Sequence, residues 1–259
     1  MPYAKLRTSR IYYEFYHNEG IPLVFIHGWA GDHSKWKKQV DFFSMRYPVI
    51  VFDLAGHGQS DPTEEYSINN HSKILHELLE YLGISQIYLV GHSMGGMVAQ
   101  QFAIDFPENI CKLILLSTTL KIINSFKDKL AVLLMRFLLR ISFRRYCKIL
   151  FTYTQPPNIS PGELAMKMKE VYSMHPKIVR KTFAEMTSYN SSNKLSSFNK
   201  PTLLIVGEKD RIITPEMTKT LQKTIPQSEL LVIQGGYHEI MLENSDEVNE
   251  AILKFIEST

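Results

Sequence analysis

The residue of this chain best placed to do covalent chemistry is a serine enclosed by glycines. Ser93 lies within Gly91-His-Ser-Met-Gly95, and a third glycine, Gly96, follows. Residues 87–90 form a short apolar run typical of a β-strand, and apolar residues at helical spacing follow the glycines. A serine at the apex of such a strand–turn–helix unit needs small neighbours, because the turn crowds its backbone. We therefore predict that Ser93 is a nucleophile at a helix N-terminus, where free N–H groups favour an anion.

The chain also offers a base and an acid that could activate this serine. A serine hydroxyl becomes a good nucleophile when a base removes its proton and a carboxylate orients that base. Asp210 lies three residues after a predicted strand that ends at Gly207, and His238 follows the next predicted strand. Since side chains beyond the carboxyl ends of parallel strands gather at one edge of the sheet, we predict a catalytic set of Ser93, Asp210 and His238. Glu208, two residues before Asp210, is the other carboxylate in this loop that competes for the role of orienting acid.

These residues depend on elements that alternate between strand and helix. Continuous apolar runs predict buried strands, and amphipathic stretches between them predict helices. Residues 3–17 predict a hairpin at the edge of the sheet. The other predicted strands are residues 22–26, 49–52, 87–90, 112–116, 201–207 and 229–233, and the helices are 34–46, 67–82, 215–224 and a last one from about 244. This order predicts an α/β fold whose sheet is parallel and covered by helices on both faces.

One long segment interrupts the alternation. No strand pattern appears in it, and helical patterns cover residues 126–150 and 161–172. We therefore predict a helical insertion within one α/β core, with the core at 1–118 and 194–259 and the insertion at 119–193.

Composition is that of an ordinary globular protein. The chain has 259 residues, of which 44% are hydrophobic and 21% charged, and its net charge is +3. Its first residues contain no apolar segment typical of a signal peptide, and no run reaches the ~18 apolar residues of a membrane span. Cys111 and Cys147 have no metal-binding spacing and do not suggest a disulfide framework. We therefore expect a cytoplasmic protein without stable membrane insertion.

The remaining histidines show no arrangement typical of a metal site. None is paired with Asp, Glu or Cys at ligand spacing, so we predict no metal. Gly56-His-Gly58 lacks the lysine and the spacing of a phosphate-binding loop, and we predict no cofactor. We expect hydrogen-bonded structural roles for His27 and His57, packing for His92, and surface positions for His17, His33, His71, His76 and His175.

Three further segments at predicted strand ends complete a familiar pattern. They are Pro22-Leu-Val-Phe-Ile-His-Gly28, Asp53-Leu-Ala-Gly-His-Gly-Gln-Ser60 and Gly236-Tyr-His238. With these motifs the chain resembles the α/β-hydrolase superfamily over essentially its whole length, and within it the serine esterase, lactonase and C–C hydrolase group. The resemblance implies a mostly parallel eight-stranded sheet and a helical cap formed by the insertion. It also implies an oxyanion hole made by the backbone N–H groups of Trp29 and Met94.

The identity of the nucleophile narrows the expected reaction. Epoxide hydrolases and haloalkane dehalogenases resemble the chain but carry Asp at the position of Ser93, so an alkyl-enzyme is not expected. The resemblance implies acyl transfer instead, in the form of hydrolysis of carboxylic esters with small to medium acyl chains. Lactonase, C–C bond hydrolase and monoacylglycerol-type lipase activities remain alternatives. A small-molecule receptor that retains the three residues is a further alternative from outside the enzymes.

The charge of the insertion does not by itself identify a binding partner. Residues 120–186 carry 13 Lys and Arg against 4 Asp and Glu, a net +9, whereas the rest of the chain sums to −6. The simplest interpretation is a solvated face opposite an apolar face that covers the pocket of a small-molecule ester. A sharper hypothesis is that the insertion attracts an anionic substrate, an acidic acyl-carrier protein or an anionic membrane surface. No nucleic-acid recognition motif accompanies the basic residues, so nucleic-acid binding is not expected.

Overall fold

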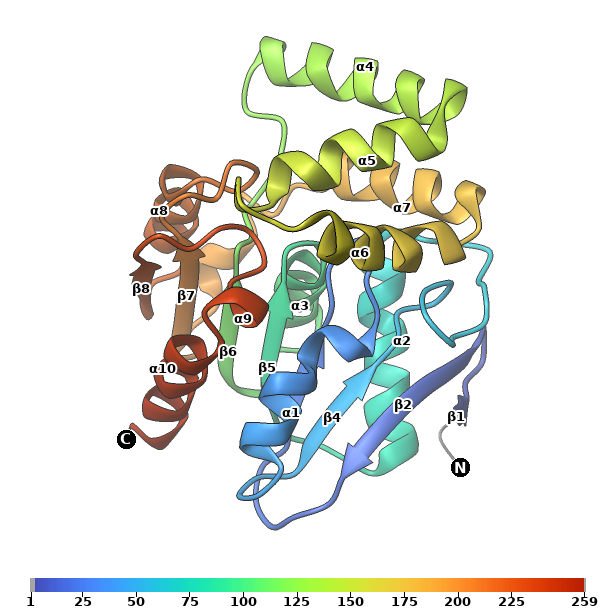
Figure 1. Cartoon of the computed structure of the whole chain (residues 1–259). Coiled ribbons are helices and arrows are strands. Elements are labelled where there is room, and N and C mark those ends of the chain that lie inside the picture. Colours follow the sequence, from blue (N-terminus) through green and yellow to red (C-terminus); the bar gives the residue numbers. More distant parts are fainter. Residues whose placement is uncertain (1–2, 259) are drawn as a thin grey trace.

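A single mixed sheet runs through the computed structural model, which describes residues 3–258. Within this range the sheet has eight strands in the order β1-β2-β4-β3-β5-β6-β7-β8 (Figure 1). β1 and β2 pair antiparallel with their neighbours, and the strands from β4 to β8 are parallel. The strands are β1 Tyr3–Lys5, β2 Arg10–Tyr16, β3 Leu23–Ile26, β4 Val49–Phe52, β5 Ile87–His92, β6 Ile110–Leu116, β7 Thr202–Gly207 and β8 Ser228–Ile233. The predicted mostly parallel α/β sheet is confirmed.

Helices cover both faces of the sheet, as predicted. The central strands are buried on both sides, so the apolar residues on their two faces belong to two separate clusters. α2, α3 and α8 contribute to one cluster, and α1 and α10 contribute to the other. The bounds are α1 Lys37–Phe43, preceded by the 3-10 turn His33–Trp36, α2 Ile68–Leu82, α3 Met94–Asp105, α8 Pro215–Thr224, α9 Ile240–Glu243 and α10 Ser245–Glu257.

Four helices between β6 and β7 lie above the carboxyl ends of the strands, and we call them the cap (Figure 1). They are α4 Phe126–Ile141, α5 Phe143–Thr154, α6 Pro161–Ser173 and α7 Pro176–Ser188. The prediction of one helix over 126–150 was wrong. Ser142 leaves the helical region at φ −143° and ψ 72°, so α4 ends there and α5 begins at the next residue. Among residues 3–258, no helix combines the length and the apolar character needed to cross a bilayer.

Candidate active site

The turn that presents Ser93 is as tight as the glycine pattern predicts. Ser93 joins β5 to α3 with φ 53° and ψ −117°, a strained conformation for a residue with a side chain. A Cβ on Gly91 would lie 2.5 Å from Gly95 O, and one on Gly95 would lie 2.3 Å from Ile26 O. A Cβ on Gly96 would lie 2.6 Å from Thr118 Cβ. The glycines are therefore required by close packing on every side of the turn.

The structure brings the predicted serine, histidine and aspartate into one hydrogen-bonded row. His238 Nε2 lies 3.1 Å from Ser93 Oγ, and His238 Nδ1 lies 2.7 Å from Asp210 Oδ2. The other carboxylate oxygen of Asp210 accepts the N–H groups of Ile212 and Ile213, both at 2.9 Å. These two amides fix the carboxylate in the orientation that meets the imidazole, so the row is held from its inner end.

The two ionisable groups of this row shift each other's pKa in opposite directions. Burial alone would raise the pKa of Asp210, but the adjacent His238 and the two backbone N–H groups outweigh it, and the pKa falls. Burial alone would lower the pKa of His238, but the charge and hydrogen bond of Asp210 outweigh it, and the pKa rises. The aspartate is thus an anion, and it holds the imidazole proton on Nδ1, which leaves Nε2 free to accept the serine proton.

His92, the residue before the serine, supports the histidine loop. Its ring is buried, as expected for a packing role, and its Nε2 lies 2.9 Å from His238 O. Burial, together with the nearby His238, lowers the pKa of His92 to about 4. The ring is therefore neutral at pH 7, and since its partner is a carbonyl, Nε2 carries the hydrogen. This bond holds the backbone of His238 against the serine turn.

The two residues predicted to form an oxyanion hole flank Ser93. Met94 is the first residue of α3, so its N–H has no acceptor within the helix. Trp29 follows Gly28, and a Cβ on Gly28 would lie 3.3 Å from Ser93 Cβ. The loop after β3 therefore runs directly against the serine.

The side chain of Trp29 has a contact that the sequence did not indicate. Its Nε1 donates to Val179 O and to Thr182 Oγ1 in α7, both at 3.1 Å. Its ring also packs against Phe151 and Phe183, with ring centroids 6.1 Å and 5.2 Å away. Trp29 thus joins the loop beside the serine to two cap helices.

A cavity of about 390 Å³ lies above the serine between core and cap. Its volume is within the range of small-molecule sites, and Ser93 and His238 line it. Other polar side chains also reach the cavity: Lys35, Asn124, Asp128, Thr154, Thr187, Arg211 and Glu239. Most of the upper wall is apolar and comes from α4, α5 and α7, through Val132, Met135, Leu150, Phe151, Phe183 and Met186. The arrangement suits a substrate with a polar reacting centre below and an apolar portion above.

A buried ionic group at the rim of the cavity was missed from sequence. Glu239, next to His238, is 7% exposed and pairs with Lys35 at 3.5 Å and with Lys167 of α6. Lys167 also donates to Gln155. Burial opposes ionisation of Glu239, but the two ammonium groups outweigh it and lower its pKa to about 2. The group links the cap to the histidine loop, and only the adjacency of Glu239 to His238 could have pointed to it.

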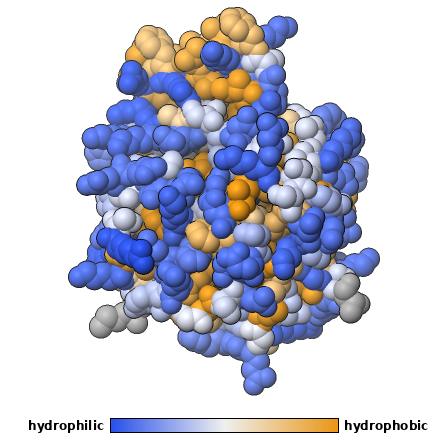
Figure 2. All heavy atoms as spheres, turned by 180° about the vertical axis from the view of Figure 1, so that it is seen from behind, coloured by the Kyte–Doolittle hydropathy of each residue, from blue (hydrophilic) through white to orange (hydrophobic). Residues whose placement is uncertain are grey.

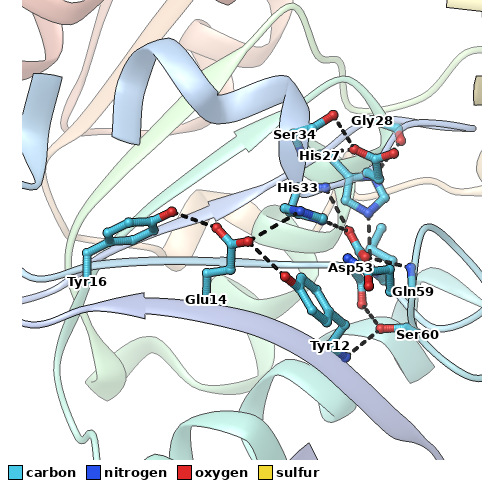
Figure 3. A network of polar contacts seen from close by, with 12 residues as sticks. Tyr12, Glu14, Tyr16, His27, Gly28, His33, Ser34, Asp53, Gln59 and Ser60 are labelled. Atoms are coloured by element: carbon cyan, nitrogen blue, oxygen red, sulfur yellow. Dashed lines mark hydrogen bonds and ion pairs between the residues drawn. The ribbon is translucent and has the colours of Figure 1, made fainter. Parts of the chain in front are cut away.

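A second Asp–His pair lies just after the end of β4 (Figure 3). Buried Asp53 follows β4, and its Oδ1 accepts the His33 N–H at 2.7 Å and lies 2.8 Å from His33 Nδ1. Asp53 Oδ2 accepts the Gln59 N–H at 2.7 Å. His33 Nε2 lies 3.6 Å from Glu14 Oε1. The prediction that His33 lies at the surface was wrong, because the buried carboxylate draws it into a half-buried position.

The surface prediction for His71 was also wrong. His71 is fully buried in α2, and its ring nitrogens have no hydrogen-bond partner among the described residues. Burial lowers its pKa to about 3. It lies three residues before Ile74 and four before Leu75, both buried, so its place on the apolar stripe was the available signal. His27, in contrast, has the expected structural role: Nδ1 lies 2.9 Å from Gly28 O, and Nε2 accepts the Leu54 N–H at 3.0 Å.

One cluster near this pair has the residue types of a metal site. Ligand atoms of Asp32, His33 and Asp53 lie within 4.8 Å of one another, although no metal was predicted. Asp32 Oδ1 already accepts the Ser34 N–H and hydroxyl, and both oxygens of Asp53 accept backbone N–H groups. These donors would compete with a cation for the same lone pairs, so we assign no ion to the cluster.

Comparison with known protein families identifies the family to which this fold and this serine turn belong. The family model of the alpha/beta hydrolase fold matches residues 21–146 and 148–245. The chain belongs to this family, which confirms the resemblance inferred from the motifs.

Individual relatives include both esterases and lactone-degrading enzymes. YugF of Bacillus subtilis, an uncharacterized hydrolase, is 27% identical over 95% of this chain and 94% of its own length. Est816, described as an N-acyl homoserine lactone degrading enzyme, is 28% identical with a TM-score of 0.88 over 98% of this chain and 100% of its own. A thermophilic esterase from Thermogutta terrifontis is 26% identical with a TM-score of 0.85 over 98% and 97%. The relatives support hydrolysis as the reaction class and leave the bond that is cleaved open.

Proposed function

We propose that this chain is a serine hydrolase that cleaves carboxylic esters of small to medium acyl chains through an acyl-enzyme on Ser93. In this proposal Asp210 and His238 are the other catalytic residues, and the backbone N–H groups of Trp29 and Met94 form the oxyanion hole. The row of hydrogen bonds from Asp210 through His238 to Ser93 Oγ, at 2.7 Å and 3.1 Å, carries the proposal. It supplies a nucleophile, a base and an orienting anion in reach of one another.

The proposed cycle has two proton transfers through one imidazole. Ser93 Oγ attacks the carbonyl carbon while His238 Nε2 takes the hydroxyl proton, and the oxyanion is held by the two backbone donors. Collapse of the tetrahedral intermediate breaks the ester bond, and His238 returns its proton to the leaving alcohol. Water then attacks the acyl-enzyme with His238 as base, which releases the acid and restores the serine.

Lactone hydrolysis is the second candidate, and one finding favours it. Est816, which matches nearly the whole chain at 28% identity, is described as degrading N-acyl homoserine lactones. The proposed cycle opens a lactone by the same steps, with the leaving alcohol still attached to the acyl group.

We also propose that residues 119–193 act as a cap unit on a core of 1–118 and 194–259. The apolar wall that this unit lends to the cavity supports the proposal, since it would exclude water from the reacting centre. In this arrangement the cap side chains, rather than the catalytic row, select the acyl group.

The deciding experiment combines a substrate series with covalent labelling. We expect turnover of p-nitrophenyl esters with a maximum at short or medium chain length, and a fluorophosphonate adduct on Ser93 found by mass spectrometry. Ser93→Ala should lose both, with activity falling by at least ~10⁴-fold. An adduct on another residue, or none, would refute the mechanism. One turnover per chain without further release would favour the receptor alternative.

A further inference from the structure

The outward face of α4 is an uncovered apolar stripe. Six large side chains of this helix are 53% to 80% exposed: Phe126, Leu130, Leu133, Leu134, Phe137 and Ile141. At about 100° per residue, they fall within an arc of roughly 100° on one side of the helix. In Figure 2, hydrophobic side chains gather at the top of the molecule, where α4 lies in Figure 1. Such a contiguous apolar surface on a folded chain marks a binding site.

The opposite face of the same helix is already used by the fold. Val132 and Leu139 are buried, and Val132 and Met135 line the cavity above Ser93. Packing against the rest of the cap therefore accounts for the inner face only. The outer stripe needs a different partner, since nothing in the fold of residues 3–258 covers it.

Cations border the stripe on α4 itself. Lys127, Lys129 and Arg140 are exposed, and at about 100° per residue they fall beside the edges of the stripe. The next helix, α5, adds exposed Arg144, Arg145 and Lys148, of which Arg144 lies over the ring of Tyr172. The one acid of α4, Asp128, is engaged at the helix start, where it accepts the N–H groups of Asn124 and Ser125. The local charge is thus strongly positive around an apolar strip.

We propose that the outward face of α4 docks on an anionic lipid surface. An exposed apolar helix face bordered by Lys and Arg is the arrangement that binds at the headgroup–acyl boundary, with side chains in the apolar layer and cations among anionic headgroups. A second copy of this chain is disfavoured as the occupant, because pairing two stripes would bring the surrounding cations together. An acidic protein would satisfy the cations but not an apolar strip of four aliphatic residues and two phenylalanines.

Docking in this way has a consequence for the cavity. The helix that would lie on the lipid is the same helix whose inner side chains roof the cavity, so the cavity would lie one helix diameter from the membrane surface. Binding to the surface itself does not depend on the activity proposed for Ser93.

The test is co-sedimentation of the full chain with lipid vesicles. We expect binding to phosphatidylglycerol–phosphatidylcholine vesicles at least ~10-fold stronger than to phosphatidylcholine alone, and weakened by salt. Leu130→Gln/Leu133→Gln/Phe137→Gln keeps the charge and should lower binding by at least ~10-fold. Met45→Gln/Tyr81→Gln is the matched control, since Met45 and Tyr81 are 76% and 54% exposed on the core, and it should bind like the unmodified chain.

Further measurements show that the variants are folded and separate the proposal from its rivals. Hydrolysis of a soluble p-nitrophenyl ester and the melting temperature should be unchanged in the triple variant, which shows that it is folded. Ser93→Ala should bind vesicles normally, so failure of the proposed reaction leaves this result intact. Equal binding of the triple variant and the control would overturn the proposal. So would absence of vesicle binding together with a dimer, in sedimentation, that the triple variant dissociates.

Discussion

Two aspartate–histidine pairs in this molecule have nearly the same inner geometry. The carboxylate–Nδ1 distance is 2.7 Å for Asp210 and His238 and 2.8 Å for Asp53 and His33. In both pairs the carboxylate is buried and also accepts backbone N–H groups. In both, the aspartate outweighs the effect of burial and raises the pKa of the histidine.

The pairs differ at the outer nitrogen of the imidazole. Nε2 of His238 meets Ser93 Oγ, which can give up a proton, whereas Nε2 of His33 lies 3.6 Å from the carboxylate of Glu14. Glu14 is itself fixed by the hydroxyl groups of Tyr12 and Tyr16 (Figure 3). Under the proposed function, His238 is a base because its second nitrogen faces the Ser93 hydroxyl, whereas the Asp53–His33 pair faces a carboxylate and is a structural clamp.

The largest expected contrast comes from the same substitution in each pair. Asp210→Asn should lower kcat on a p-nitrophenyl ester on the order of 10⁴-fold, because an amide does not hold the imidazole in the required tautomer. Asp53→Asn should change kcat by less than about tenfold. It should instead reduce the free energy of unfolding by about 2 kcal/mol, because its NH₂ would face buried N–H donors. Steady-state kinetics and urea unfolding measure both, and equal losses of kcat would contradict the distinction.

The hydrogen-bonded row of Ser93, His238 and Asp210 was predictable from sequence because local rules place its members. Ser93 is defined by its own glycines, and Asp210 and His238 by their positions just after β7 and β8, so no long-range contact had to be foreseen. His33 contacts Asp53 across 20 residues and Glu14 from the antiparallel β2. Whether these side chains come into contact depends on strand order and register, which the spacing of residues along the sequence does not reveal.

The packing of the cap was likewise only partly predictable from the sequence. Its helical character and its charge were predictable from periodicity and composition. The break at Ser142 was not, because the apolar spacing continues through it. Periodicity also does not tell which of two apolar faces of α4 is covered, since that depends on where the rest of the cap lies. The ionic link of Glu239 to Lys35 and Lys167 is another contact between distant segments.

The pH dependence of stability should separate paired histidines from unpaired ones. His71 has a folded pKa of about 3, below its usual 6.5, so its contribution is full above pH 6.5 and is lost as the pH falls toward 3. Between pH 7 and 4.5 this loss is about 2 kcal/mol. His71→Gln should therefore flatten the fall of the unfolding free energy over that range. His33→Gln should not, because the raised pKa of His33 stabilises the fold at low pH and loses its effect as the pH rises through the folded value. Urea unfolding at a series of pH values measures the slopes.

The smallest expected effects come from the second carboxylate beside each pair. Glu239 helps to raise the pKa of His238, with a smaller effect than that of Asp210 and against the opposing effect of burial, and it is held by two lysines. Glu239→Gln should move the acidic limb of the kcat/KM profile to lower pH by less than about one unit, with kcat within about fivefold. Glu14→Gln is the matched control and should leave that limb in place, because Glu14 faces the other pair. A shift of the same size in both variants would show that overall charge, rather than proximity to His238, sets the pKa of the base.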